Sequence, residues 1–172
     1  MASSASSVLA SAGVKGGKIC VLGAGSYGTA IANVATFNGS SVSLYMRSAE
    51  QAAAINSTHV NPKRFTDCTL PDAIVATSDF DEAVAGAEVI VLAIPSQVMP
   101  DFISKFAGQF PAGVPVVSTA KGIHVATHQL MSEAIPTAFG DRLSEVSGSG
   151  GGVGVGVGMG ENGRHGGGSQ QG

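Results

Sequence analysis

The stretch that decides the fold of this chain is Gly23-Ala24-Gly25-Ser26-Tyr27-Gly28. It follows a short apolar run, Ile19-Cys20-Val21-Leu22, which is β-branched at two positions and carries no charge, as is typical of a strand buried on both faces. After the turn, apolar residues recur at helical spacing from Tyr27 to Val34, and Asn38-Gly39 is a suitable helix stop. The pattern predicts a strand, a glycine turn and a helix.

Each glycine of this turn has its own steric role in a dinucleotide-binding site. Gly23 allows the tight bend, Gly25 lets the backbone approach a pyrophosphate, and Gly28 lets the helix pack closely against the strand. The amino terminus of the helix then faces the anion. An ordinary glycine-rich turn is the alternative, and the order of strand, turn and helix favours dinucleotide binding.

The length and charge of the chain limit its class. With 172 residues, the chain is long enough for one domain with a substantial core and too short for two ordinary ones. The formal net charge is −3 and the lysines and arginines form no cluster along the sequence, so we expect no nucleic-acid partner. No apolar stretch reaches the roughly eighteen residues that cross a bilayer, so we expect no membrane span.

Cysteines and histidines give no metal or disulfide pattern. Cys20 and Cys68 are too few for a disulfide framework, which favours a reducing compartment. His124 and His128 are four residues apart and could share a helix face, but no matching cysteine or carboxylate accompanies them. Surface histidines near a helix start are the preferred interpretation, and we expect no metal site.

The first sixteen residues, 1–16, are rich in serine and alanine and contain one lysine and no acid. They lack the long apolar core of a secretory signal. We expect a disordered leader on a cytoplasmic protein. The alternative is a transit peptide for a plastid or another organelle, which has a similar composition but is usually longer and richer in arginine.

The rest of the chain alternates between apolar runs and helical segments. The predicted strands cover 42–46, 73–77, 89–94 and 116–120, of which 89–94 should lie centrally. The predicted helices follow Ser48 and Asp79, begin at Pro100, and cover 127–134 before Pro136. Two prolines and mixed charge predict a loop over 61–71. This alternation predicts an α/β fold with a Rossmann-like, doubly wound parallel sheet in a single domain.

In such a sheet, ligands bind beyond the carboxyl ends of the strands. The residues that follow those ends are therefore the site candidates, and they are the glycine turn, Arg47, Pro95-Ser96-Gln97 and Lys121. Arg47 stands where an acid usually binds the adenosine ribose of NAD, so an arginine favours a 2′-phosphate; the alternative is an exposed arginine that stacks on adenine or faces water. For Lys121, binding of an anionic ligand is preferred over a solvated lysine in a turn.

Several further segments carry a family resemblance in one order. They are Val21 to Ala30, Leu44-Tyr45-Met46-Arg47, Ile55-Asn56 with Asn61, Leu70-Pro71, Ala93-Ile94-Pro95-Ser96-Gln97 and Ala120-Lys121-Gly122-Ile123. On these segments the chain resembles the amino-terminal domain of the NAD(P)-dependent glycerol-3-phosphate dehydrogenases, closest to the bacterial type, from Lys18 to about Val146. The family usually has tryptophan at the position of Tyr27.

The resemblance implies NAD or NADP as cofactor and a homodimer for the full-length relatives. It implies hydride transfer between sn-glycerol 3-phosphate and dihydroxyacetone phosphate, with Lys121 touching both cofactor and substrate. It also implies that Ser26, Tyr27 and Arg47 contact the dinucleotide. With the glycine turn and the strand ends included, the expected cofactor-binding residues are Gly23, Gly25, Ser26, Tyr27, Gly28, Arg47, Pro95 and Lys121. A dehydrogenase for another hydroxy acid is disfavoured by Ala120-Lys121-Gly122-Ile123, which such relatives generally lack.

The chain departs from the family after its cofactor domain, which we expect at 17–146. Enzymes of this kind continue into a helical domain that supplies the catalytic lysine, whereas residues 147–172 here predict a disordered glycine-rich tail. No lysine follows Lys121, so we expect no catalytic residue in this chain. We expect the chain alone to bind dinucleotide at best weakly and to show little or no turnover, as in a truncated or altered splice form. The alternative is a non-catalytic dinucleotide-binding module with a flexible tail.

Overall fold

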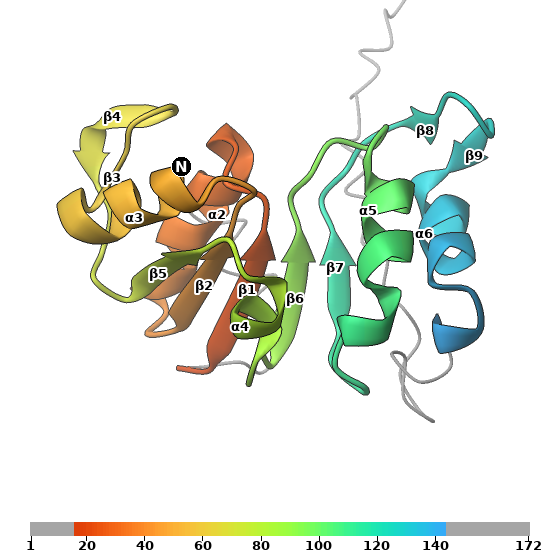
Figure 1. The fold of residues 1–172 in the computed structure, drawn as a ribbon, viewed down its shortest axis with the longest axis horizontal. Helices are drawn as coiled ribbons and strands as arrows, with labels where there is room; N and C mark the ends of the chain where they lie inside the picture. The colour runs from red at the N-terminus through yellow and green to blue at the C-terminus, as the bar shows by residue number, and fades with distance from the viewer. Residues whose placement is uncertain (1–15, 144–172) are drawn as a thin grey trace, which may run out of the picture.

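The structure, a computed structural model, describes residues 16–143, which contain one five-stranded sheet and two small hairpins (Figure 1). The strands of the main sheet are β1 (Lys18–Leu22), β2 (Ser41–Tyr45), β5 (Ile74–Thr77), β6 (Val89–Leu92) and β7 (Val116–Ser118). They are all parallel and lie in the order β5-β2-β1-β6-β7. The predicted doubly wound parallel sheet is confirmed, and its strand order reverses between β1 and β6.

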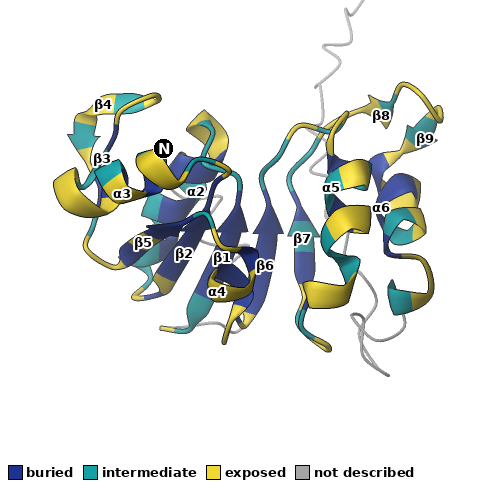
Figure 2. Ribbon diagram, viewed as in Figure 1, coloured by how far each residue is buried: buried dark blue, intermediate teal, exposed yellow. Residues whose placement is uncertain are grey.

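Helices cover both faces of this sheet. One face carries α2 (Ser26–Phe37) and α3 (Ala49–Thr58), and the other carries α4 (Phe80–Val84), α5 (Met99–Phe106) and α6 (Met131–Phe139). Ile19 and Val21 of β1 pack toward the first pair of helices, whereas Cys20 and Leu22 pack toward the other three, because successive side chains of a strand point to opposite faces. Figure 2 shows the result, a sheet whose central strands are buried from both sides.

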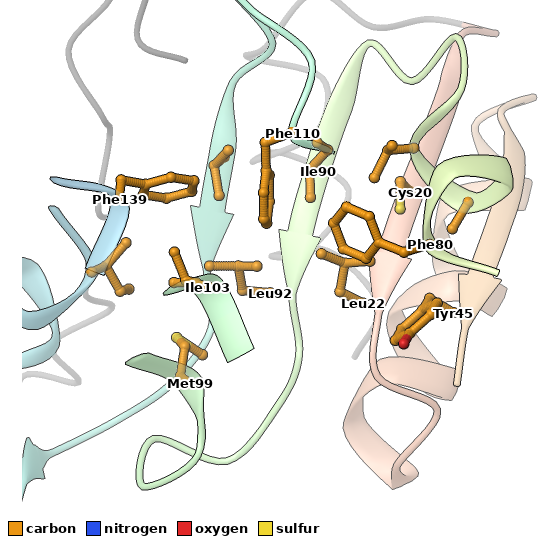
Figure 3. Close-up of a cluster of buried hydrophobic side chains, with 14 of the residues drawn as sticks. Cys20, Leu22, Tyr45, Phe80, Ile90, Leu92, Met99, Ile103, Phe110 and Phe139 are labelled. Carbon is orange, nitrogen blue, oxygen red and sulfur yellow. The ribbon is translucent and has the colours of Figure 1, made fainter. Parts of the chain in front are cut away.

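An aromatic cluster fills the core under α4 and α5 (Figure 3). The ring of Phe80 stacks on that of Phe106 with 4.3 Å between centroids, and Tyr45 meets Phe80 edge-on at 5.7 Å. Offset stacked and edge-to-face pairs are the arrangements that aromatic rings prefer. These contacts attach two helices firmly to the carboxyl end of β2.

The apolar residues at helical spacing on α2 are only partly buried. Tyr27 is 60% exposed, whereas Ile31 is half-buried and packs against the core. The side chains that α2 buries are instead small, and they belong to Gly28, Thr29, Ala32 and Ala35. The close approach of the helix to β1 that Gly28 permits leaves no room for larger side chains on this face.

A hairpin replaces the predicted loop at 61–71. β3 (Val60–Asn61) pairs antiparallel with β4 (Phe65–Thr69). Pro62 lies in the turn and Pro71 lies beyond the hairpin, so neither removes a hydrogen bond of the ladder. The hairpin is short and mostly exposed, which is why its sequence lacks the apolar alternation of a core strand.

The last helix, predicted at 127–134, begins at Met131 and continues through Pro136. Met131, Ile135 and Phe139 are all buried at a spacing of four residues, and their burial outweighs the backbone hydrogen bond that the proline removes. The residues before it form a second hairpin of β8 (Ile123–His124) and β9 (Gln129–Leu130). His124 and His128 therefore do not share a helix face.

Within residues 16–143, none of the helices has the length and apolar character needed to cross a membrane. The same residues contain no group of three or more metal-ligating side chains. The predicted leader at 1–16 lies outside the described residues except for Gly16, and the predicted tail at 147–172 lies wholly outside them.

Candidate functional site

A cavity of about 1060 Å³ opens at the carboxyl ends of the sheet strands. These strand ends form the upper edge of the sheet in Figure 1. Its walls come from the glycine turn after β1, the segments after β2, β6 and β7, the turn of the β3–β4 hairpin, and α5. Open parallel sheets bind their ligands at this edge, beside the point where the strand order reverses. The cavity is therefore the candidate binding site.

Most of the residues proposed from the sequence meet on this wall. Those that line the cavity are Gly23, Gly25, Ser26, Tyr27, Arg47, Pro95 and Lys121. Gly28 is buried beneath the turn, and Ser96 and Gln97 lie off the wall. Seven of the eight proposed cofactor-binding residues thus surround one space, although they come from four separate segments.

The three glycines of the turn have different surroundings. At Gly23, where φ is +118°, a Cβ atom would lie 2.6 Å from the carbonyl oxygen of Ala93, and at Gly28 it would overlap the carbonyl oxygen of Gly23. Both positions therefore require glycine for the fold itself. A Cβ atom at Gly25 would meet nothing within 4 Å. The fold itself does not require glycine at position 25. A ligand that approaches the backbone closely would require it.

The amino terminus of α2 is open beside Gly25. Gly25 is the N-cap residue, no side chain caps the helix, and its first turn contains no acidic residue. The first amide groups of a helix lack partners within the helix and carry partial positive charge. This end of α2 is consequently suited to a phosphate group.

Asn61 joins the glycine turn to two neighbouring segments. The side chain is fully buried, and its Nδ2 donates to the carbonyl oxygen of Ala24 at 3.2 Å and to Oγ1 of Thr29 at 2.9 Å. Its Oδ1 accepts from Nε2 of Gln51 at 3.0 Å and from the backbone N–H of Lys63 at 3.2 Å. One residue therefore fixes the turn, the start of α3 and the β3–β4 hairpin together, a role that no local pattern in the sequence indicates.

Five of the seven lysines and arginines within residues 16–143 line the cavity. They are Arg47, Lys63, Arg64, Lys105 and Lys121. Asp101 is the only carboxylate on this wall among the described residues. Basic residues that are widely spaced along the sequence, apart from the pair Lys63-Arg64, are thus concentrated in space. Lys63, Arg64 and Lys105 could not be identified as site residues before the fold was known.

Aromatic side chains form an apolar part of the wall. Tyr45, Phe102 and Phe106 line it, and Nζ of Lys105 lies 4.9 Å from the centre of the Phe106 ring. Burial raises the pKa of the Tyr45 phenol, so this group is uncharged at neutral pH. Flat apolar surfaces beside cations can hold a heteroaromatic ring by stacking.

Gln97, one of the site candidates from the sequence, does not line the cavity but makes two hydrogen bonds to the β8–β9 hairpin. Its Nε2 donates to the carbonyl oxygen of Ile123 at 2.8 Å, and its Oε1 accepts from the N–H of Val125 at 2.9 Å. These two bonds tie the segment after β6 to the β8–β9 hairpin, directly after the exposed Lys121. Gln97 therefore links the cavity-lining segment after β6 to the chain that follows Lys121.

Sequence comparison gives a consistent family. A family model described as the N-terminus of NAD-dependent glycerol-3-phosphate dehydrogenase matches residues 18–151. The chain is 38% identical over 135 residues to a glycerol-3-phosphate dehydrogenase (NAD(P)+) of Leptospira biflexa, covering 76% of this chain and 40% of that protein. It is 39% identical over 129 residues to a second such enzyme, of Mycobacterium bovis, covering 75% of this chain and 39% of the relative. The chain spans about 40% of the length of these curated relatives.

Solved structures give the same result for the fold. Glycerol-3-phosphate dehydrogenase from Coxiella burnetii superposes with a TM-score of 0.67 at 24% identity, over 74% of this chain and 39% of that one. The enzyme from Saccharomyces cerevisiae superposes with a TM-score of 0.63 at 29% identity, over 72% of this chain and 39% of that one.

Proposed function

Because the chain belongs to the NAD-dependent glycerol-3-phosphate dehydrogenase family, we propose that it binds NAD or NADP in the cavity at the carboxyl edge of its sheet. The names of its relatives support this cofactor. We extend their activity to the protein that contains this domain, which would interconvert sn-glycerol 3-phosphate and dihydroxyacetone phosphate. The domain itself would supply the cofactor half of that enzyme.

The free space at Gly25 is the observation that carries the proposal. A pyrophosphate at this point would meet the open amino terminus of α2 and the backbone of Ser26 and Tyr27. Gly23 and Gly28 would act from below by bringing strand, turn and helix close together. We assign Arg47 to the adenosine end of the cofactor, and Pro95 and Lys121 to the nicotinamide end.

When bound, the cofactor would carry the hydride to or from the substrate. The residues of this chain would then bind it, orient it and hold the substrate's negative charge. The exposed ammonium group of Lys121 can contact a phosphate because it lies on the wall beyond β7, and we propose that it touches both cofactor and substrate. Among the residues of this chain we assign none to proton transfer.

Two further assignments are each supported by a single observation. We propose a homodimer for the full-length protein, which is supported by the family resemblance alone. A cytoplasmic compartment is supported by the composition of residues 1–16, which lack a long apolar core. Delivery to a plastid or another organelle is the alternative.

The proposal is tested by calorimetric titration of the purified 172-residue chain with NADH and with NADPH. We expect saturable binding of at least one of them. Binding of neither at millimolar concentration would reject the proposal. A second measurement, reduction of dihydroxyacetone phosphate by the same chain, should show little or no turnover. Turnover at ordinary enzyme rates of about 1–1000 per second would contradict the assignment of no catalytic group.

A further inference from the structure

Lys121 lies on a short span of chain that is anchored on both sides to one neighbouring segment, which begins at the end of β6. Before Lys121, the backbone N–H and Oγ1 of Thr119 both donate to the carbonyl oxygen of Leu92, at 3.1 and 2.9 Å. After it, Nε2 of Gln97 donates to the carbonyl oxygen of Ile123 at 2.8 Å. The backbone is thus fixed two residues before Lys121 and two residues after it.

The second of these anchors depends on one side chain. Besides its bond to Ile123, the amide of Gln97 accepts from the backbone N–H of Val125 at 2.9 Å, so it donates and accepts as a backbone peptide group does in a ladder. Between Lys121 and this anchor lies Gly122, where φ is +96° and a Cβ atom would meet nothing within 4 Å. Lys121 and Gly122 are both exposed, and glycine is conformationally permissive, so the position of this turn depends on the Gln97 bonds.

The anchoring segment also forms part of the cavity wall. Ala93, Ile94 and Pro95 line the cavity, as Lys121 does, whereas Gln97 does not. One segment therefore presents a surface to the proposed cofactor and, through its two ends, holds the backbone around Lys121. The separation between this wall and the Lys121 backbone is consequently set before a ligand arrives.

An anchored backbone matters for a lysine in particular. The side chain of Lys121 is flexible and exposed, so packing does not restrain it. Ordering such a group on a ligand costs conformational entropy, and the cost is smaller when its backbone is already fixed. Removal of one anchor should therefore weaken the contact between Lys121 and a ligand without removing the cation.

We propose that Gln97 is a positioning residue, which holds the backbone of Lys121 so that its ammonium group meets both the nicotinamide cofactor and the substrate. Gln97 itself touches neither, since it lies off the cavity wall. The inference rests on the proposed function and extends it from the residues that line the cavity to one that acts through Lys121.

The test is a double-mutant cycle on NADH affinity, measured by calorimetry on the full 172-residue chain at one ionic strength. We expect Gln97→Ala to weaken NADH binding about fivefold, and no more than Lys121→Ala does. In the Lys121→Ala background, the same substitution should change the affinity by less than about twofold, because the cation that Gln97 positions is then absent. An equal loss in both backgrounds would show a general structural role and would overturn the inference.

Gln109→Ala is the matched control, because it removes another exposed glutamine side chain, on the 3₁₀ turn η1 (Ala107–Gln109) outside the cavity wall. It should leave NADH affinity unchanged. Gln97 is exposed, so Gln97→Ala should also keep the circular dichroism spectrum and the unfolding temperature of the unmodified chain. Unchanged NADH affinity in Gln97→Ala would contradict the proposed role.

Amide hydrogen exchange tests the anchor without any cofactor. In Gln97→Ala the N–H of Val125 should exchange faster, whereas the N–H of Thr119, which is bonded to Leu92, should keep its rate. An unchanged rate at Val125 would show that Gln97 does not hold this segment, and it would overturn the inference while leaving the proposed cofactor binding intact. Failure of NADH and NADPH to bind the unmodified chain would instead reject the proposed function, and the inference with it.

Discussion

The side-chain amide of Asn61 donates a hydrogen bond to the carbonyl oxygen of Ala24, 37 residues earlier in the chain, at 3.2 Å. It connects a short hairpin, which covers neither face of the sheet core, to the turn on which the cofactor would rest. The stability of the turn and the position of the hairpin are consequently not independent.

We predict that Asn61→Ala lowers the free energy of unfolding by about 2–4 kcal/mol. The substitution leaves the buried partners of Asn61 without their bonds, and an unsatisfied buried polar group costs about 1–3 kcal/mol. Urea unfolding followed by circular dichroism measures the change. Thr66→Ala, on the exposed strand β4, is the control and should change the value by less than about 0.5 kcal/mol. A similar change for both variants would show that the Asn61 network contributes little.

The pair Gly25→Ala and Gly28→Ala should separate binding from folding. Gly25 has ordinary backbone angles and free space at its Cβ position, so its substitution should cost at most about 1 kcal/mol of stability but at least about tenfold in cofactor affinity. At Gly28 a methyl group would overlap backbone, and about 3 kcal/mol of stability should be lost. Unfolding and calorimetric titration of both variants check this. Unchanged cofactor affinity in Gly25→Ala would show that no ligand approaches this residue closely.

Lys121→Ala should weaken the binding of both nicotinamide cofactors severalfold, because it removes a cation from the wall of the cavity beyond β7. The exposed side chain makes a change in stability above about 0.5 kcal/mol unexpected. Lys18→Ala is the matched control, since Lys18 begins β1 at the opposite edge of the sheet and donates to the carbonyl oxygen of Ala85. Equal weakening by both substitutions would point to a general effect of net charge.

The two cysteines should differ in reactivity and in their effect on stability. Burial raises the pKa of the Cys20 thiol from 9.0 to about 12, whereas Cys68 lies on the hairpin strand β4. At pH 8 an aromatic disulfide reagent should therefore modify Cys68 rapidly and Cys20 only after unfolding. Rapid modification of two thiols in the folded chain would contradict this.

The raised pKa of Cys20 also makes the stability of the protein depend on pH. The folded chain keeps the Cys20 proton to higher pH than the unfolded chain does, so the contribution of the neutral thiol is intact below about pH 9 and is lost as the pH rises toward 12. Unfolding free energies should fall over this range, and they should fall less steeply in Cys20→Ala. An identical slope in both proteins would refute the assignment.

The core of the fold could be predicted from the sequence, because the two features that indicate it, the apolar run and the glycine turn, are local in the sequence. Residues 19–22 are apolar on both faces of the strand and form most of β1. The steric demands of Gly23 and Gly28 fix the position of the helix that follows. The hairpins β3–β4 and β8–β9 could not be predicted, since three of their four strands are two residues long and the fourth, β4, has few apolar residues. Tertiary contacts, not periodicity, decide such elements.

The candidate site could be predicted only in part, for a related reason. Arg47 and Lys121, which lie two and three residues after the ends of β2 and β7, are placed by the topology of the sheet, and the structure brings both to the cavity. Lys63 and Arg64 reach the same cavity only because the buried Asn61 positions their hairpin. No spacing pattern in the sequence predicts a hydrogen bond between residues 37 positions apart.

Because five cations line one cavity, ligand binding is coupled to the folding of the domain. These side chains come from positions between Arg47 and Lys121, far apart in an unfolded chain, and folding brings them together against their mutual repulsion. A polyanionic nucleotide that binds only the folded state relieves this repulsion and shifts the folding equilibrium by mass action. The midpoint of thermal unfolding should therefore rise with nucleotide concentration, so that the supply of cofactor sets how much of this domain is folded.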